Sequence, residues 1–137
     1  MRLVLDTNIL MSALIVPTGF PDRLYQQWRG GRFILITSEK QLDEFRRVTR
    51  YPRLKPFLSP AAAGTMFNEL RLLATFVTNL PLIDVSPDPD DNFLLAMAEA
   101  GQADYLVTRD KPGVLALGRH KNTHTVTVGH MVGLLEK

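Results

Sequence analysis

Acidic residues stand where short apolar runs end, and this arrangement recurs at distant places in the chain. The runs 3–5 and 105–107 are followed by Asp6 and by Asp110, and a third acidic segment, 88–92, precedes a predicted helix. In a parallel α/β sheet the carboxyl ends of the strands share one edge, and ligands bind in the crevice above it. Carboxylates that meet there repel one another, so such a cluster indicates a compensating cation. The first hypothesis is therefore a divalent-metal site.

Apolar runs alternate with segments of helical periodicity along the chain, which has 137 residues and fits a single domain over 1–137. The first run is contiguous rather than alternating, as is typical of a buried strand. Strands are predicted over 2–5, 33–36, 82–85, 103–107 and, as an edge strand, 123–128. A long helix is predicted from Pro60 to about Phe76. This order favours an α/β fold, a three-layer α/β/α sandwich with a central parallel sheet of four to five strands.

Composition narrows both the class of protein and the kind of metal. No apolar run approaches the roughly 20 residues that span a bilayer, so no membrane association is expected. The chain has no cysteine, which excludes thiolate sites and fits a cytoplasmic location. The three histidines, all between 120 and 130, lack a ligand spacing on one helix. Oxygen ligands then favour Mg²⁺ or Mn²⁺, and a metal rather than a protein nucleophile would activate water for attack on a phosphate.

Each acidic residue also has an explanation that requires no metal. Asp6 could cap the following helix, Asp91 falls in a first helical turn where the macrodipole favours negative charge, and Asp110 fits a turn. Three such residues at one sheet edge nevertheless favour a site. Glu44 is a fourth candidate because it lies on the margin of the apolar face of its helix. A pair with Arg47 explains Glu44 about equally well.

Four segments carry these residues in order: LVLDTNIL at 3–10, LDEFRRV at 42–48, DPDDN at 88–92 and LVTRDK at 106–111. Together they resemble the PIN-domain family of metal-dependent ribonucleases, over essentially the whole chain. The resemblance implies that the catalytic and metal-binding acids are Asp6, Glu44, Asp91 and Asp110. It implies supporting roles for Thr7, Asn8, Asp88, Asp90, Asn92, Thr108 and Arg109. Arg109 departs from the family pattern, since many members have Gly there, and it places a cation near the site.

The nearest branch resembles the small VapC-type toxins of toxin–antitoxin pairs, which implies an antitoxin partner and a homodimer. Housekeeping RNA-processing nucleases and non-catalytic PIN scaffolds that bind RNA or a protein are the alternatives. A haloacid-dehalogenase-like phosphatase is disfavoured because Asp6-Thr7-Asn8 lacks the second acid of that motif, and a response-regulator receiver would need an acid pair near its first strand.

Two further groups of residues bear on binding. A basic group on the second motif's helix and the following loop could track an RNA backbone, with Tyr51 available for stacking, or could be a solvated face. This basic group comprises Arg46, Arg47, Arg50, Arg53 and Lys55. An apolar group on the first two helices could form a dimer surface or pack onto the sheet. It comprises Leu10, Leu14, Ile15, Phe20, Leu24, Tyr25 and Trp28.

Overall fold

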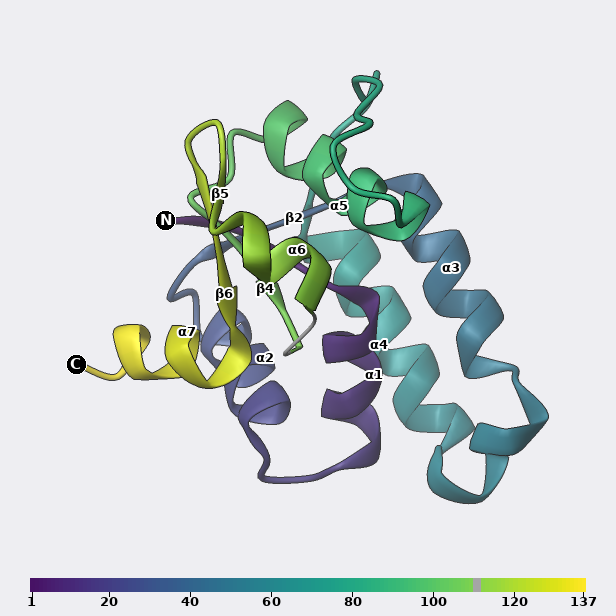
Figure 1. The fold of residues 1–137 in the computed structure, drawn as a ribbon. Coiled ribbons are helices and arrows are strands. Elements are labelled where there is room, and N and C mark those ends of the chain that lie inside the picture. The colour runs from purple at the N-terminus through teal and green to yellow at the C-terminus, as the bar shows by residue number, and fades with distance from the viewer. Residues whose placement is uncertain (110–111) are drawn as a thin grey trace.

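The computed structural model of the protein describes residues 1–109 and 112–137 (Figure 1). The strands are β1 (Arg2–Leu5), β2 (Ile34–Thr37), β3 (Thr75–Phe76), β4 (Tyr105–Thr108), β5 (Arg119–His120) and β6 (Thr123–Thr127). The helices are α1 (Thr7–Ile15), α2 (Phe20–Arg29), α3 (Glu39–Thr49), the 3-10 helix η1 (Pro52–Phe57), α4 (Pro60–Leu73), α5 (Pro89–Ala100), α6 (Pro112–Leu117) and α7 (Val128–Leu135).

The strands form one sheet in the order β3-β2-β1-β4-β6-β5. All neighbouring pairs are parallel except β5 and β6, which form an antiparallel edge. The predicted α/β fold with a central parallel sheet is therefore confirmed, although the described sheet has six strands rather than four to five. Because β1 lies between β2 and β4, the end of β1 is at the middle of the sheet edge, where a ligand can be approached from both sides.

Helices cover both faces of the sheet because its central strands are apolar on both faces. Leu3 and Leu5 point into one core, formed with α1, α2, α3, α4 and α7, while Val4 between them points into a second core against α5. β2 and β4 behave in the same way. This alternation follows from the pleat, in which successive side chains point to opposite faces.

Helix starts follow local capping chemistry. The Ser38 and Ser59 side chains accept hydrogen bonds from backbone N–H groups at the starts of α3 and α4, and Asp88 caps α5 with Pro89 in its first turn. Both serines and Asp88 are residue types that commonly cap helices, and proline fits the first turn because it needs no N–H donor there.

The predicted strand at 82–85 is wrong, because Leu82 and Val85 are exposed in a loop. The place beside β2 is taken instead by the two-residue β3, whose Thr75 lies opposite Ile36. Accordingly α4 ends at Leu73 and not at Phe76. The segment near 123–128 is a strand but not an edge strand, since β6 lies between β4 and β5.

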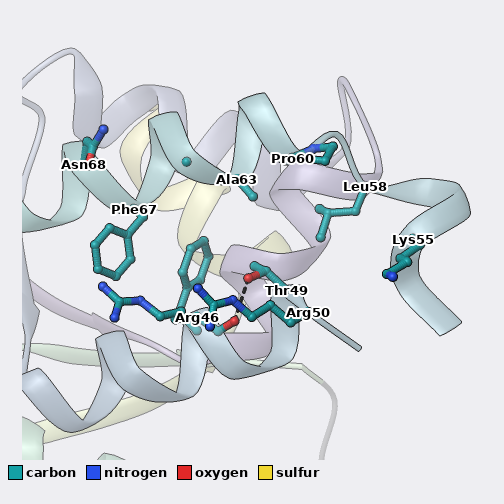
Figure 2. A pocket seen from close by; sticks show the side chains of 11 residues that line it. Arg46, Thr49, Arg50, Lys55, Leu58, Pro60, Ala63, Phe67 and Asn68 are labelled. Carbon is teal, nitrogen blue, oxygen red and sulfur yellow. Dashed lines mark hydrogen bonds between the residues drawn. The ribbon is translucent and has the colours of Figure 1, made fainter. Parts of the chain in front are cut away.

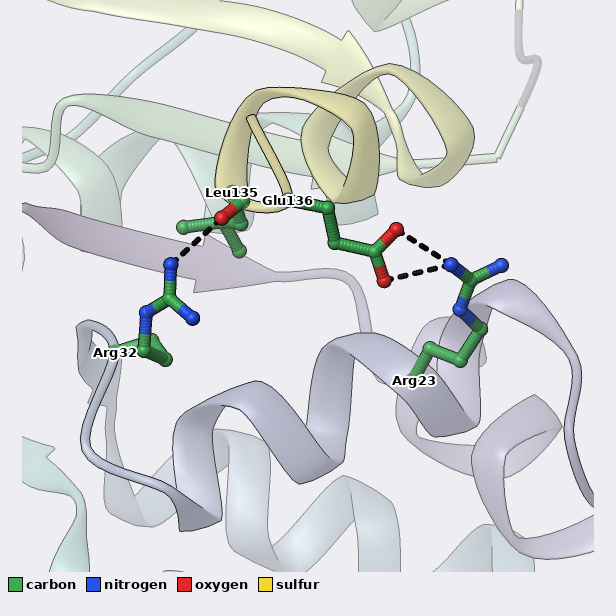
Figure 3. A network of polar contacts seen from close by, with 4 residues as sticks. All are labelled: Arg23, Arg32, Leu135 and Glu136. Atoms are coloured by element: carbon green, nitrogen blue, oxygen red, sulfur yellow. Dashed lines mark hydrogen bonds and ion pairs between the residues drawn. The ribbon is translucent and has the colours of Figure 1, made fainter.

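The C-terminal helix α7 is anchored to α2 and to the following turn (Figure 3). Two Arg23–Glu136 contacts of 2.6 and 2.5 Å join α2 to the end of α7, and Arg32 donates to the Leu135 carbonyl at 2.7 Å. Of the apolar group on the first two helices, Leu10, Leu24, Tyr25 and Trp28 are buried in the core and Phe20 is half exposed. Packing onto the core therefore explains most of that group. None of the described helices is long and apolar enough to cross a bilayer.

Candidate active site

Asp6 lies at the junction between β1 and α1, and hydrogen bonds to β4 and α1 hold it there. Its backbone N–H donates to the Val107 carbonyl at 2.9 Å, which ties it to β4. Its Oδ1 accepts from the Asn8 N–H at 3.1 Å, and its Oδ2 accepts from the Thr108 hydroxyl at 2.9 Å. Asp6 is only 4% exposed. Asp6 is therefore a helix cap, and the same contacts orient its carboxylate at the carboxyl edge of the sheet.

A pocket of about 190 Å³ brings Asp6 together with Glu44 of α3. We call it the carboxylate pocket. Its other lining residues come from the start of α1, the end of α3, the chain around η1 and the first turns of α5: Thr7, Asn8, Arg47, Val48, Tyr51, Arg53, Asp90, Phe93 and Leu94. The pocket thus combines acidic groups with two arginines and one aromatic ring, a set of groups that suits a phosphodiester held beside a cation.

The acidic segment before α5 is divided among different roles. Asp88 caps α5 by accepting from the Asp90 N–H at 2.9 Å. Asp90 is exposed and lines the carboxylate pocket. Asp91 is buried, with 3% of its surface exposed, and its Oδ2 accepts from the Ser86 hydroxyl at 3.3 Å. Asn92 holds the preceding loop, since its Oδ1 accepts from the Ser86 N–H at 3.0 Å and its Nδ2 donates to the Ser86 carbonyl at 2.7 Å. Asp91 is the assigned acid, yet Asp90 is the residue that lines the carboxylate pocket.

The structure describes Thr108 and Arg109 at the end of β4. Thr108 is fully buried and bonded to Asp6. Arg109 is exposed, and its Nη2 donates to the Ser12 hydroxyl on α1 at 2.5 Å, so it is not among the lining of the carboxylate pocket. The predicted ligand Asp110 lies outside the described residues.

The oxygen donors of the carboxylate pocket are of the kind that bind a hard cation, but they do not form a complete set of metal ligands among the described residues. Asp6 and Glu44 supply carboxylate oxygens and Asn8 an amide, whereas no sulfur or histidine nitrogen lines the pocket. Across residues 1–109 and 112–137, no three acidic or histidine side chains lie close enough to hold a metal ion. Asp6 and Glu44 are therefore the part of the proposed ligand set that the described structure brings together, and Asp90 adds a third carboxylate to the pocket lining.

Gln41 is a positioning residue that the sequence analysis missed. It is 2% exposed, and its Nε2 donates to the Leu5 carbonyl at 2.7 Å while its Oε1 accepts from the Thr37 hydroxyl at 2.7 Å. Gln41 therefore joins the ends of β1 and β2 to α3, the helix that carries Glu44. The sequence does contain an indication of this role, because Gln41 is a polar residue on the core-facing side of an amphipathic helix, next to Leu42.

The basic group is divided between two pockets. Arg47 and Arg53 line the carboxylate pocket, whereas Arg46, Arg50 and Lys55 line a second pocket of about 660 Å³ (Figure 2). This second pocket lies between α3, η1 and α4, and we call it the α3–α4 pocket. Its other lining residues are Phe45, Thr49, Leu58, Pro60, Ala63, Gly64, Phe67 and Asn68.

Comparison with known proteins identifies the family to which this chain belongs. A PIN domain model matches residues 2–112, from β1 through the segment after β4. The chain is also 28% identical, over 116 residues, to an uncharacterised protein of Methanocaldococcus jannaschii, MJ1680; the match covers 80% of this chain and 71% of the archaeal protein. No solved structure gives a significant match. The family match spans most of the chain, including Asp6, Glu44 and the acidic segment before α5, and the chain therefore belongs to the PIN domain family.

Proposed function

We propose that this protein is a divalent-metal-dependent endoribonuclease whose active centre is the carboxylate pocket. PIN domains are generally nucleases and generally use divalent metals. The observation that carries the proposal is that Asp6 and Glu44, 38 positions apart in the sequence (44 − 6), line one pocket together with Arg47 and Arg53. Carboxylates for a cation and guanidinium groups for a phosphate are what hydrolysis of a phosphodiester requires.

The proposed metal is Mg²⁺ or Mn²⁺, held by Asp6 and Glu44 with Asp91 and Asp110 as the remaining acids. When bound, such an ion polarises the scissile phosphate and lowers the pKa of a water molecule. The protein's own contribution is orientation. Thr108 and the Asn8 N–H fix the Asp6 carboxylate, and Gln41 holds the helix that carries Glu44 against the end of β1.

Substrate binding is assigned to the cationic and aromatic side of the carboxylate pocket. Arg47 and Arg53 would bind phosphate oxygens, since a guanidinium group donates two parallel hydrogen bonds to them. The Arg53 guanidinium lies 5.6 Å from the centroid of the Tyr51 ring. Both groups are planar, and an unpaired base can stack on a planar group of this kind. Single-stranded RNA has such accessible bases and a duplex does not.

We extend the proposal to the biological role of a toxin component of a toxin–antitoxin pair, with an antitoxin protein and a second copy of the chain as partners. This role rests on the resemblance of the four segments to VapC-type toxins. Its test is genetic: a neighbouring gene for a small DNA-binding protein whose co-expression relieves growth arrest supports it. Expression of the nuclease alone without any effect on growth contradicts it and favours a housekeeping role.

The enzymatic proposal is tested by cleavage of a generic single-stranded RNA with Mn²⁺. We expect Asp6→Asn and Asp91→Asn each to abolish cleavage while the fold persists, because an Asn at position 6 still accepts the capping hydrogen bond from Asn8. Glu44→Gln is compared with Asp43→Asn, since Asp43 is the neighbouring exposed carboxylate on α3 and lies outside the pocket lining. Equal Mn²⁺ affinity by calorimetry in wild type and Asp6→Asn would sink the assignment.

A further inference from the structure

The α3–α4 pocket is larger than the carboxylate pocket and differs from it in charge. Its lining includes no acidic residue, whereas Arg46, Arg50 and Lys55 are all exposed along it. Among the described residues, none of these three cationic groups forms an ion pair with a carboxylate. Three cations without acidic partners around one hollow indicate an anionic ligand.

The interior of the α3–α4 pocket is apolar and has room for a flat group. Phe45, Leu58 and Ala63 are buried residues of its lining. The guanidinium of Arg46 lies 4.5 Å from the centroid of the Phe67 ring, and the two side chains face one another in Figure 2. Gly64 lies within α4, and a Cβ atom added there would meet nothing within 4 Å. Glycine destabilises the interior of a helix relative to alanine, so Gly64 lowers the stability of α4 and leaves open space in the pocket.

We infer that the α3–α4 pocket is a nucleotide-binding subsite for single-stranded RNA, outside the catalytic pocket. This inference rests on the proposed ribonuclease function and deepens it. A base would stack on the Arg46 guanidinium, which Phe67 supports from behind, and the Asn68 amide lines the same pocket as a donor and acceptor for the base edge. Arg50 and Lys55 would bind the adjoining phosphate.

Continuity between the two pockets favours RNA over an acidic peptide. Arg46 and Arg47 are neighbours on α3 but line different pockets, and Arg53 and Lys55 of η1 are divided in the same way. The end of α3 and η1 therefore carry cations on both sides of one short stretch of chain. A strand with a negative charge at every nucleotide can be neutralised continuously along this path. An acidic peptide offers no flat base to stack on the Arg46 guanidinium.

Basic residues near the end of a helix also have a local explanation, because cations there offset the negative end of the macrodipole. That explanation accounts for charge at Arg46, Arg47 and Arg50. It does not account for Lys55 on η1, for the apolar hollow or for the glycine that leaves the hollow open.

The test uses the full-length protein in EDTA, so that binding is measured without cleavage. A 12-nucleotide oligouridylate labelled at its 5′ end is titrated with wild type, with Gly64→Leu and with Gly133→Leu, and anisotropy is recorded. Gly133 is a matched control because it also lies within a helix, α7, with nothing within 4 Å of an added Cβ. We expect Gly64→Leu to weaken binding about tenfold, as for the loss of one stacked base, and Gly133→Leu to bind like wild type.

A second variant and a second readout keep the test independent of folding. Arg50→Ala, at an exposed position, should weaken binding of the same oligonucleotide and flatten its salt dependence. A 4-thiouridine placed at successive positions of the oligonucleotide should crosslink to the peptide around Phe67 in wild type and not in Gly64→Leu. Thermal melting should show that Gly64→Leu is at least as stable as wild type, since leucine raises the helix propensity.

Several outcomes overturn the inference. Equal affinity of wild type and Gly64→Leu does so, and so does equal weakening by both leucine variants. A Gly64→Leu variant that binds RNA normally but loses an acidic, apolar peptide assigns the pocket to a protein partner instead. Failure of the proposed function looks different, because then Mn²⁺ gives no cleavage of any RNA while the binding measurements in EDTA remain valid.

Discussion

Thr108→Val isolates the hydrogen bond that holds the proposed principal acid. The Thr108 hydroxyl is fully buried and donates to the Asp6 Oδ2 at 2.9 Å. Valine has nearly the same shape, so the change removes the donor without a large cavity. Hydrogen bonds to charged groups contribute about 1.5–3 kcal/mol, and the carboxylate is left buried without this donor. We therefore expect the free energy of unfolding to fall by about 2 kcal/mol.

The same estimate gives an expected change in melting temperature. With an unfolding entropy of about 2.1 cal/mol/K per residue, a chain of 137 residues has about 0.29 kcal/mol/K, so 2 kcal/mol lowers Tm by roughly 7 °C. Residues that hydrogen-bond to metal ligands orient those ligands, as Thr108 does for Asp6. The affinity of Thr108→Val for Mn²⁺ should therefore also fall by about 10- to 100-fold. Urea unfolding, calorimetric melting and Mn²⁺ titration measure the three quantities.

Thr125→Val is the matched control. Thr125 lies on the neighbouring strand β6, and its hydroxyl is buried with no hydrogen-bond partner among the described residues. The same substitution there should leave stability unchanged or raise it, since an unsatisfied buried hydroxyl is replaced by a methyl group. A Thr108→Val variant as stable as Thr125→Val would refute the reasoning. In a double-mutant cycle, Thr108→Val and Asp6→Asn should show a coupling energy of about 1–3 kcal/mol.

Three further results are expected. Gln41→Leu should cost about 1–3 kcal/mol for each group it leaves unsatisfied at Leu5 and Thr37, and should lower cleavage more than Thr125→Val in the same assay. Burial and the Glu69 hydrogen bond raise the pKa of the Tyr25 hydroxyl above its ordinary value of about 10. The stabilising contribution of Tyr25 is therefore fully present below pH 10 and is lost as the pH rises toward the raised pKa. The difference in unfolding free energy between wild type and Tyr25→Phe should shrink above pH 10, and a constant difference up to pH 11 contradicts this. Sedimentation at micromolar concentration should show the proposed homodimer, and a strict monomer would remove it; quenching of Trp28 is uninformative because the core already buries it.

Local chemistry made several features predictable from the sequence. Ser38 and Asp88 cap helices because a side-chain oxygen can reach N–H groups two or three residues ahead, whatever the rest of the chain does. The position of Glu44 on the margin of an apolar helix face likewise follows from helical periodicity, and the structure places it on the pocket wall. By contrast, the apolar segment around Leu82 resembles a strand but has no partner, and strand formation depends on a partner.

The sequence alone determined that Asp6 directly follows a buried apolar strand and so stands at the carboxyl edge of a parallel sheet. Only the tertiary structure decided which of the other predicted site residues face a common pocket: Asp90 lines it, Asp91 is buried beside Ser86, and Arg109 is drawn to Ser12. It also divided neighbouring arginines between two pockets. The physical reason is that strand ends and helix faces are set by contacts between nearby residues. The direction of a side chain at a helix start or loop depends instead on which distant elements pack against it.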